Sequence, residues 1–140
     1  MSTTQITIDG RPALRVERRL AYPVDRVWRA VTDPAELERW FVATVAWIPE
    51  LGETFEAYGQ SGEITALDPP HAIAWTFGGE RFSFELDEDG EGCLLVFMHV
   101  FDDPSLSGQH SRGWEIYFTR LDVHLEGGYL SEEDAHAQRA

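Results

Sequence analysis

His99 is the residue whose type and position point most directly to chemistry. It alternates with Phe97 and Phe101 in a strand-like segment, so its imidazole is expected on the buried face of that strand. An imidazole in a pocket can share a hydrogen bond with a ligand carbonyl or phenol, or act as an acid or base near neutral pH. The alternative is a core histidine whose nitrogens bond to the backbone or to a neighbouring side chain.

Arg18 is the second polar candidate, because it lies on the apolar face of the segment 13–20. A buried guanidinium without a counter-charge is very costly, so a carboxylate is expected beside it. Glu56 or Glu63, on neighbouring strands, is expected to form a structural ion pair with it. Recognition of a ligand carboxylate is the alternative.

Aromatic side chains from several segments are predicted to meet around these two polar groups. Such a lining would suit a flat or hydrophobic ligand, with the Tyr117 hydroxyl as a polar tip. The alternative is a closed, fully packed core. Trp40 and Phe41, at the end of the second predicted helix, are expected to cap the core, and guarding a pocket mouth is the alternative for them. The predicted pocket residues are Trp40, Phe55, Trp75, Phe84, Phe97, His99, Trp114, Tyr117 and Phe118, with Arg18 and His99 as polar anchors.

The sequence lacks other catalytic and metal-binding patterns. His71, His110, His124 and His136 do not have the i, i+4 or short cross-strand spacing that is typical of metal sites. Cys93 has no histidine partner near it in the sequence, and neither a Ser-His-Asp order nor a glycine-rich phosphate loop occurs. We therefore expect no metal, no cofactor and no catalytic residue.

Two short amphipathic helices are predicted over residues 23–41. The first carries an apolar stripe at i, i+3, i+4 and i+7, beginning at Val24. Asp33 is placed to accept from the free amides of the second helix, and Pro34 sits where no donor is needed. Glu36 is expected to complete a capping box.

Short strands bounded by turn residues surround this helical pair. A strand over 13–20 precedes it, and Asp9-Gly10 favours a hairpin between residues 6–8 and that strand. The alternation of apolar and polar residues is typical of an antiparallel sheet with one buried face. Six strands are predicted after the helices, at 43–48, 53–58, 62–67, 72–77, 80–87 and 93–101.

A long helix is predicted from the apolar residues that recur with helical spacing from Gly113 to Leu125. Ser107 or Ser111 is expected to cap its start, and Gly127-Gly128 to end it. Its polar residues are expected to face away from the sheet, namely Glu115, Arg120, Asp122, His124 and Glu126.

This order of elements predicts an α+β helix-grip fold, in which a curved antiparallel sheet wraps around the long C-terminal helix. The chain is expected to form one domain over residues 1–140, with a structured core at about 13–126 and a loose tail at 127–140. Val96, Met98 and Val100 are apolar on the outer face of the last strand. We expect a second copy of the chain, or the N-terminal segment, to cover them.

The formal net charge of −14 disfavours nucleic acid and anionic membranes as partners. No apolar run is long enough to cross a bilayer, no signal peptide is apparent, and Cys93 is the one cysteine, so a cytoplasmic protein is expected. The acidic runs at 85–91 and 132–134 fit a solvated turn and tail. A docking patch for a protein partner is the alternative.

A set of ordered motifs covers about residues 13–126. These are Pro23, Val27-Trp28, Thr32-Asp33-Pro34, Trp40-Phe41, Gly52, Phe55, Gly62, Asp68-Pro69-Pro70, Trp75, Gly92, Leu95, His99, Gly113-Trp114 and Leu121. Together they resemble the Hsp90 ATPase activator homologues, small bacterial proteins of the START-like (SRPBCC) superfamily that also contains the birch-pollen allergen. Tyr22 departs from the alanine usual there. His99 matches the histidine of that family.

The resemblance implies the helix-grip fold, often with a cavity between sheet and helix. We expect a non-catalytic binding protein for a small hydrophobic molecule. One alternative is a co-chaperone-like module that binds a protein partner. The other is an enzyme of cyclase or hydrolase type that uses His99 as acid or base.

Overall fold

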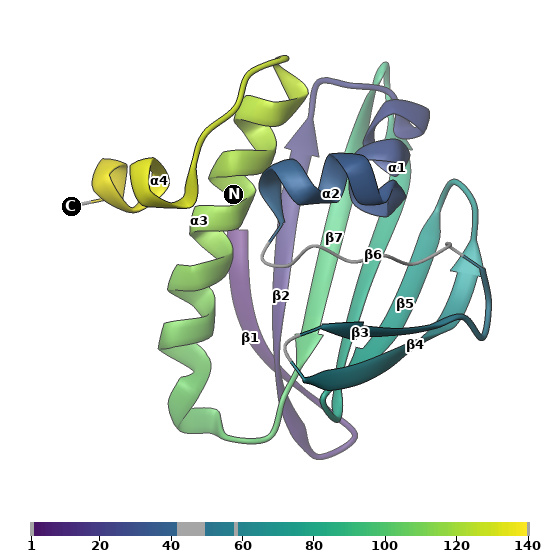
Figure 1. Ribbon diagram of the computed structural model, residues 1–140, viewed down its shortest axis with the longest axis vertical. Helices are drawn as coiled ribbons and strands as arrows, with labels where there is room; N and C mark the ends of the chain where they lie inside the picture. The colour runs from purple at the N-terminus through teal and green to yellow at the C-terminus, as the bar shows by residue number, and fades with distance from the viewer. Residues whose placement is uncertain (1, 42–49, 58, 140) are drawn as a thin grey trace.

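The computed structural model describes residues 2–41, 50–57 and 59–139. A seven-stranded antiparallel sheet has the order β1-β2-β7-β6-β5-β4-β3 (Figure 1). The strands are β1 (Ser2–Ile8), β2 (Arg11–Leu20), β3 (Thr54–Ala57), β4 (Gln60–Asp68), β5 (Ala72–Phe77), β6 (Glu80–Asp89) and β7 (Gly92–Val100). The α-helices are α1 (Val24–Thr32), α2 (Pro34–Trp40), α3 (Ser107–Leu125) and α4 (Glu132–Arg139).

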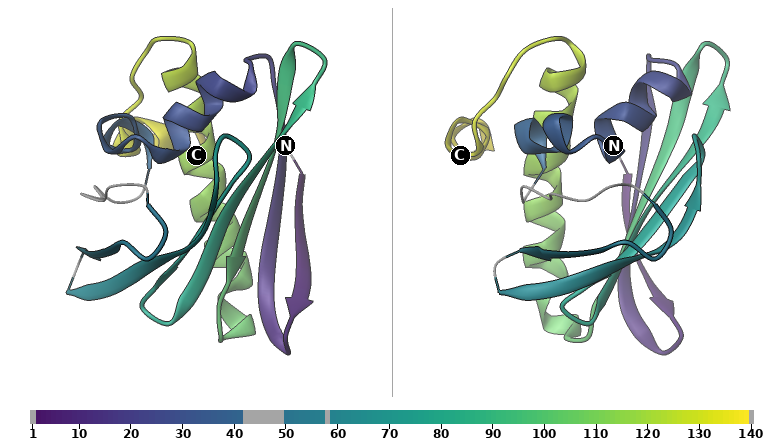
Figure 2. Two further views of the ribbon diagram at one scale, coloured as in Figure 1. Left: turned by 90° about the vertical axis from the view of Figure 1, so that its right-hand side faces the viewer. Right: turned by 45° about the vertical axis from the view of Figure 1, so that its right-hand side comes forward.

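The sheet curves around α3, and α1 and α2 cover one end of the space between them (Figure 2). One core cluster joins side chains from the sheet, from the helical pair and from α3. The predicted α+β helix-grip fold is therefore confirmed.

The strands lie close to their predicted positions. Asp9 and Gly10 have φ angles of 52° and 77°, the left-handed conformation that a two-residue hairpin turn requires, and they connect β1 to β2. The ends of β2 to β7 differ from the predicted ends by no more than two residues. The strand predicted at 43–48 falls outside the described residues.

The helical pair forms as its pattern indicates, with one difference at the cap. Asp33 accepts a hydrogen bond from the Ala35 amide at 3.0 Å, as predicted. Glu36 does not complete a capping box, because the Asp33 amide already donates to the Arg29 carbonyl. The Glu36 carboxylate instead lies 2.6 Å from an Arg26 nitrogen and 2.9 Å from His124 Nε2.

Helix α3 begins earlier than the apolar spacing suggests. Ser107 is its first residue, and neither predicted serine caps it; a short 3₁₀ turn, Pro104–Leu106, leads into the helix. Trp114, Phe118 and Leu121 are buried toward the sheet, as expected. The polar side of α3 is less exposed than expected.

Arg120 and His124 on that side are both buried. The Arg120 guanidinium donates to the carbonyls of Leu130 and Arg39, at 2.8 and 3.1 Å. These partners belong to the C-terminal segment and to α2, which cover this side of α3. Arg120 and His124 therefore lie on the predicted polar side of α3, but other parts of the chain cover them, so they are not exposed to solvent.

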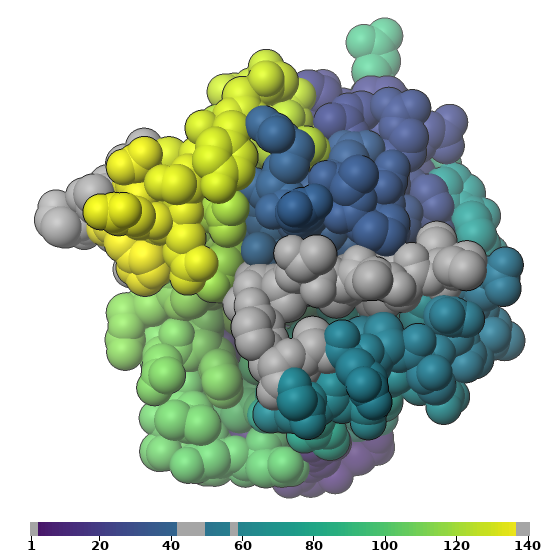
Figure 3. Space-filling model, viewed as in Figure 1, coloured from purple at the N-terminus to yellow at the C-terminus, as the bar shows by residue number. Residues whose placement is uncertain are grey.

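The residues expected to form a loose tail include helix α4. Leu130 and Ala135 are buried, and they form a second, smaller apolar cluster with Ile116 of α3. In the space-filling view the C-terminal segment, in yellow, lies against α3, in green (Figure 3). The contacts of Leu130 and Ala135 with Ile116 therefore hold the C-terminal segment against α3. Among the residues that the structure describes, no helix combines the length and apolar composition needed to cross a bilayer.

Candidate ligand-binding site

Most of the predicted pocket residues pack against one another. The side chains of Trp40, Phe84, Phe97 and Phe118 are fully buried. The Phe84 and Phe97 ring centroids lie 5.0 Å apart, and those of Phe97 and Phe118 lie 5.5 Å apart. Trp75 lies 5.6 Å from Phe84 in the same cluster. These five side chains form the packed interior that the sequence left as the alternative.

Phe55 belongs to the same core cluster but lies on the short β3 strand. Its ring stacks on Phe77 at a centroid distance of 5.9 Å. A Cβ at Gly62 of the adjacent strand would lie 2.6 Å from the Phe55 ring, so the glycine is needed for this packing. The Phe55 ring therefore packs closely over Gly62 and Phe77 of the two neighbouring strands.

His99 is buried, with an exposed fraction of 3 %. The Trp114 indole Nε1 donates to His99 Nδ1 at 3.0 Å, and His99 Nε2 lies 2.6 Å from Glu80 Oε1. Because an indole N–H can only donate, Nδ1 must be the acceptor and Nε2 must carry the proton that Glu80 accepts. The neighbours therefore use both nitrogens, which agrees with the core-histidine alternative.

Burial lowers the pKa of His99 below its ordinary value, and nearby His110 lowers it further. The Glu80 carboxylate acts in the opposite direction, but burial is the larger effect. The neutral imidazole thus suits its two hydrogen bonds. Protonation would place a second N–H against the Trp114 N–H.

Glu80, His99 and His110 each offer a ligand atom within 4.8 Å of the others, a grouping that could hold a metal ion. Zinc would need the lone pair of His99 Nε2, and Nδ1 would then carry the proton. That proton would face the Trp114 indole N–H, which cannot accept it. This donor arrangement does not suit a metal ion.

The sequence pattern does not link His110 with His99, since one lies on α3 and the other on β7. Their ring centroids are 4.7 Å apart, and His110 Nε2 is buried with no hydrogen-bond partner among the described residues. The sequence signal for their proximity is the i, i+4 spacing of His110 and Trp114, because Trp114 contacts His99. This spacing puts both side chains on one side of the helix.

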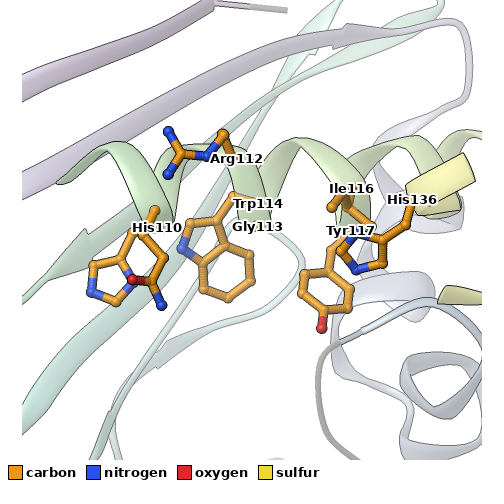
Figure 4. Close-up of a pocket in the computed structure, with 8 residues that line it drawn as sticks. His110, Arg112, Gly113, Trp114, Ile116, Tyr117 and His136 are labelled. Atoms are coloured by element: carbon orange, nitrogen blue, oxygen red, sulfur yellow. The ribbon is translucent and has the colours of Figure 1, made fainter. Parts of the chain in front are cut away.

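An open pocket of about 460 Å³ runs along the first half of α3. Trp114, Ile116 and Tyr117 supply apolar wall, and Gly113 lies among them (Figure 4). The view shows His110, Trp114 and Tyr117 projecting from the same side of α3, while His136 approaches from α4. The remaining polar lining comes from Gln109 and Arg112.

Gly113 keeps part of this pocket empty. A Cβ built at Gly113 would meet no atom within 4 Å, although the residue lies in the interior of a helix. Glycine costs about 1 kcal/mol relative to alanine at such a position. No packing contact to another part of the described chain requires it.

Arg18 reaches α3 and not the neighbouring strands that were expected to supply its partner. Its guanidinium lies 2.6 Å from an Asp122 carboxylate oxygen. The predicted partners, Glu56 and Glu63, lie on β3 and β4, at the far side of the sheet from β2. The ion pair connects β2 to the second half of α3, so Arg18 does not line the pocket.

The outer face of the sheet has a second hollow of about 290 Å³, lined in part by Ile8, Met98 and Val100. Val96 and Val100 are buried, whereas Met98 is half-buried. Arg81 of β6 donates to Asp9 in the hairpin turn at 3.1 Å. Ile8 of the N-terminal hairpin therefore borders the same hollow as Met98 and Val100, and the covering of the patch by this segment or by a second copy stays a prediction.

Solved structures share this fold with the chain. The crystal structure of CalU16 from Micromonospora echinospora is 27 % identical, with a TM-score of 0.75, covering 89 % of this chain and 83 % of that one. DynU16, a protein in the dynemicin biosynthetic locus, is 25 % identical, with a TM-score of 0.70, covering 84 % of this chain and 48 % of its own.

The Aha1 dimer from Colwellia psychrerythraea has a TM-score of 0.70 at 16 % identity, covering 81 % of this chain and 96 % of that one, which shows the fold alone. Comparison with curated proteins gives no match. The family model described as "Activator of Hsp90 ATPase homolog 1-like protein" matches residues 21–126. The chain therefore belongs to the Activator of Hsp90 ATPase homolog 1-like family.

Proposed function

We propose that this chain is a non-catalytic binding protein for a small hydrophobic molecule, held in the pocket beside α3. The observation that carries the proposal is the pocket of about 460 Å³ between Trp114, Tyr117 and the bare backbone of Gly113. Its volume is within the usual range of about 300–1,000 Å³ for small-molecule sites, and its lining is mainly apolar. Aromatic walls with a few polar groups are typical of such sites.

The proposed site differs from the cavity expected from the sequence. Of the predicted residues, Trp114 and Tyr117 line the pocket, whereas Phe97 and Phe118 pack behind them. His99 supports the site indirectly, because it accepts the hydrogen bond that orients the Trp114 ring. Catalysis by His99 is not part of the proposal, because its Nε2 proton is directed at Glu80.

Native mass spectrometry of the freshly purified protein tests this role. We expect a co-purified small molecule, or uptake of the neutral dye Nile red, by the wild type and by Gly113→Ala. Gly113→Phe should lose both, because its ring would occupy the pocket. Equal uptake by the phenylalanine variant, or no uptake by any of the three, would contradict the proposal. Far-ultraviolet circular dichroism shows whether each variant is folded.

We place this role in the cytoplasm, because the single cysteine favours a reducing compartment. Cys93 is buried, and burial raises the pKa of its thiol to about 11, so it is poorly suited to act as a nucleophile.

A second candidate function is a co-chaperone-like interaction with a protein partner, which the family description favours. The turnover of an Hsp90-type ATPase, measured with and without this chain, separates the two functions. Stimulation that persists in Gly113→Phe would favour protein binding, because that activity would not need the pocket.

A homodimer through the outer face of the sheet is a further proposal, supported by the hollow beside Met98. Sedimentation at low micromolar concentration should show a dimer that Met98→Glu dissociates. A wild-type protein that is monomeric at that concentration would contradict the proposed homodimer.

A further inference from the structure

We infer that ligand binding in the pocket beside α3 and docking of helix α4 on α3 stabilise each other, so that α4 regulates the affinity of the site. This inference rests on the proposed binding function and concerns the regulation of the same pocket. The family model ends at residue 126, so α4 lies outside the part of the chain that this model matches.

The pocket and the C-terminal segment occupy one continuous stripe along α3. Four residues of the stripe recur at i, i+4, i+7 and i+11, namely Gln109, Gly113, Ile116 and Arg120. The first three line the pocket. Arg120 is covered by the C-terminal segment, in which the Leu130 carbonyl accepts from Arg120 Nε at 2.8 Å. The pocket is therefore the part of this stripe that the C-terminal segment leaves open.

Helix α4 forms one end of the pocket (Figure 4). His136 of α4 and Tyr117 of α3 both belong to the lining. The Tyr117 hydroxyl donates to the Glu132 carboxylate, at the start of α4, at 2.8 Å. Ile116 also lines the pocket, and it belongs with Ala135 to the second apolar cluster. Two walls of the pocket, Ile116 and Tyr117, are therefore also part of the surface on which α4 docks.

Helix α4 is attached more weakly than the residues before it. The Leu130 carbonyl is bound by the buried Arg120, whereas the hydrogen bond from Tyr117 to Glu132 lies in an exposed position. Among the side chains of α4 that the structure describes, Ala135 is the buried one. A helix of eight residues is too short to be stable by itself in water. The docked and undocked states of α4 are therefore close enough in free energy for a ligand to shift their balance.

A ligand in this pocket favours the docked state, because His136 is part of the lining only while α4 lies on α3. By linkage, a bound ligand raises the equilibrium constant for docking by the same factor by which docking raises the affinity for the ligand. When α4 is released, the apparent affinity falls in proportion to the docked fraction that is lost. The coupling can therefore be measured from either side.

Hydrogen exchange of the wild-type chain tests the effect of the ligand on α4. The backbone amides are followed by mass spectrometry with and without a saturating concentration of the neutral dye Nile red. We expect exchange in α4 to slow by at least about fivefold when the dye is bound, the lower end of typical coupling between sites. The turn between β6 and β7, which contributes no residue to the described lining, should exchange equally in both samples.

Two matched variants test the effect of α4 on the ligand. Ala135→Gln places a longer polar side chain at the buried position of α4, so it should undock the helix and weaken Nile red binding at least about fivefold. Glu133→Gln introduces the same residue at an exposed position of α4 and should leave the affinity unchanged. Fluorescence titration measures the affinities, and thermal unfolding shows whether each variant keeps the fold.

A third variant, Tyr117→Phe, keeps the ring that lines the pocket and removes only the hydroxyl that binds Glu132. It should weaken Nile red binding by about two- to threefold, because an exposed hydrogen bond contributes little. Exchange in α4 of the free variant should rise by a similar factor.

The outcomes separate the coupling from the pocket itself. If the dye binds without slowing exchange in α4, or if Ala135→Gln binds it as tightly as the wild type, the coupling is wrong while the pocket stands. Equal weakening by Glu133→Gln would also contradict the coupling, because that change does not disturb docking. If the wild type takes up no dye, the proposed function itself fails.

Discussion

The two halves of helix α3 satisfy their polar side chains in different ways. In the second half, Asp122 pairs with Arg18, Arg120 donates to two carbonyls, and His124 meets Glu36. In the first half, Arg112 is unpaired in the described structure and His110 Nε2 has no partner there. The second half therefore makes more of the polar contacts that join α3 to the rest of the fold than the first half does.

The adjacent residues Phe118 and Tyr117, near the middle of α3, give the largest predicted difference, because Phe118 faces the core and Tyr117 borders the pocket. Phe118 is fully buried, so Phe118→Ala should lower the free energy of unfolding by about 3–5 kcal/mol. Tyr117→Ala should cost about 1 kcal/mol, because its ring borders the open pocket. Urea denaturation measures both. Equal losses would mean that Tyr117 is packed as tightly as Phe118.

The Arg18–Asp122 pair should give a smaller effect. Arg18 is mostly buried, but the Asp122 side chain is 40 % exposed, so solvent screens the pair. A double-mutant cycle with Arg18→Gln and Asp122→Asn should give a coupling free energy of about 1 kcal/mol. The same cycle with Glu63→Gln, the partner expected from the sequence, should give none. Coupling to Glu63 would argue against the observed pairing.

Acid should destabilise the protein through His99. Burial lowers the pKa of His99 in the folded chain. When the pH is below the ordinary pKa of histidine, the unfolded chain therefore binds a proton at this residue that the folded chain does not. Stability should therefore fall as the pH drops from about 6.5 towards the lowered pKa. His71, whose pKa is raised by Glu88, acts with the opposite sign.

Comparing the pH dependence of the free energy of unfolding between the wild type and His99→Gln isolates the contribution of His99, because His71 contributes equally to both proteins. Urea denaturation between pH 7.5 and 5 should show a weaker loss of stability on acidification in the variant. A parallel loss in both proteins would mean that His99 is not the source.

Gly113 should show the smallest effect on stability. Gly113→Ala should raise the free energy of unfolding by about 0.5–1 kcal/mol, because alanine favours the helix and its Cβ meets open space. Thermal denaturation measures the gain. A loss would show that the position is more crowded than it is in the structure, and it would weaken the proposed pocket.

The parts of the fold that depend on local pattern could be predicted from the sequence. The alternation that places Phe97, His99 and Phe101 on one face of β7 is a short-range property, as is the Asp9-Gly10 turn. The approximate ends of the strands and the capping by Asp33 have the same origin. The order of the elements predicted the helix-grip arrangement, and the likeness to the family implied the same fold.

The partners of polar side chains could not be predicted in this way. Arg18 was matched with Glu63 by assuming that the strands are neighbours, yet β7, β6 and β5 lie between β2 and β4. The helical C-terminal segment was missed because its few apolar residues, Leu130 and Ala135, look too sparse until α3 provides Ile116 as their contact.

The sequence by itself determined most of the strands, the two short helices and the buried position of His99, because these follow from the spacing of residues along the chain. Only the tertiary structure decided which polar groups meet, where the interior is filled and where a pocket remains. Those outcomes depend on contacts between residues far apart in sequence, such as Arg18 with Asp122 and His99 with Trp114. Hydrogen bonds require a geometry of a few ångströms, which residue spacing alone does not specify.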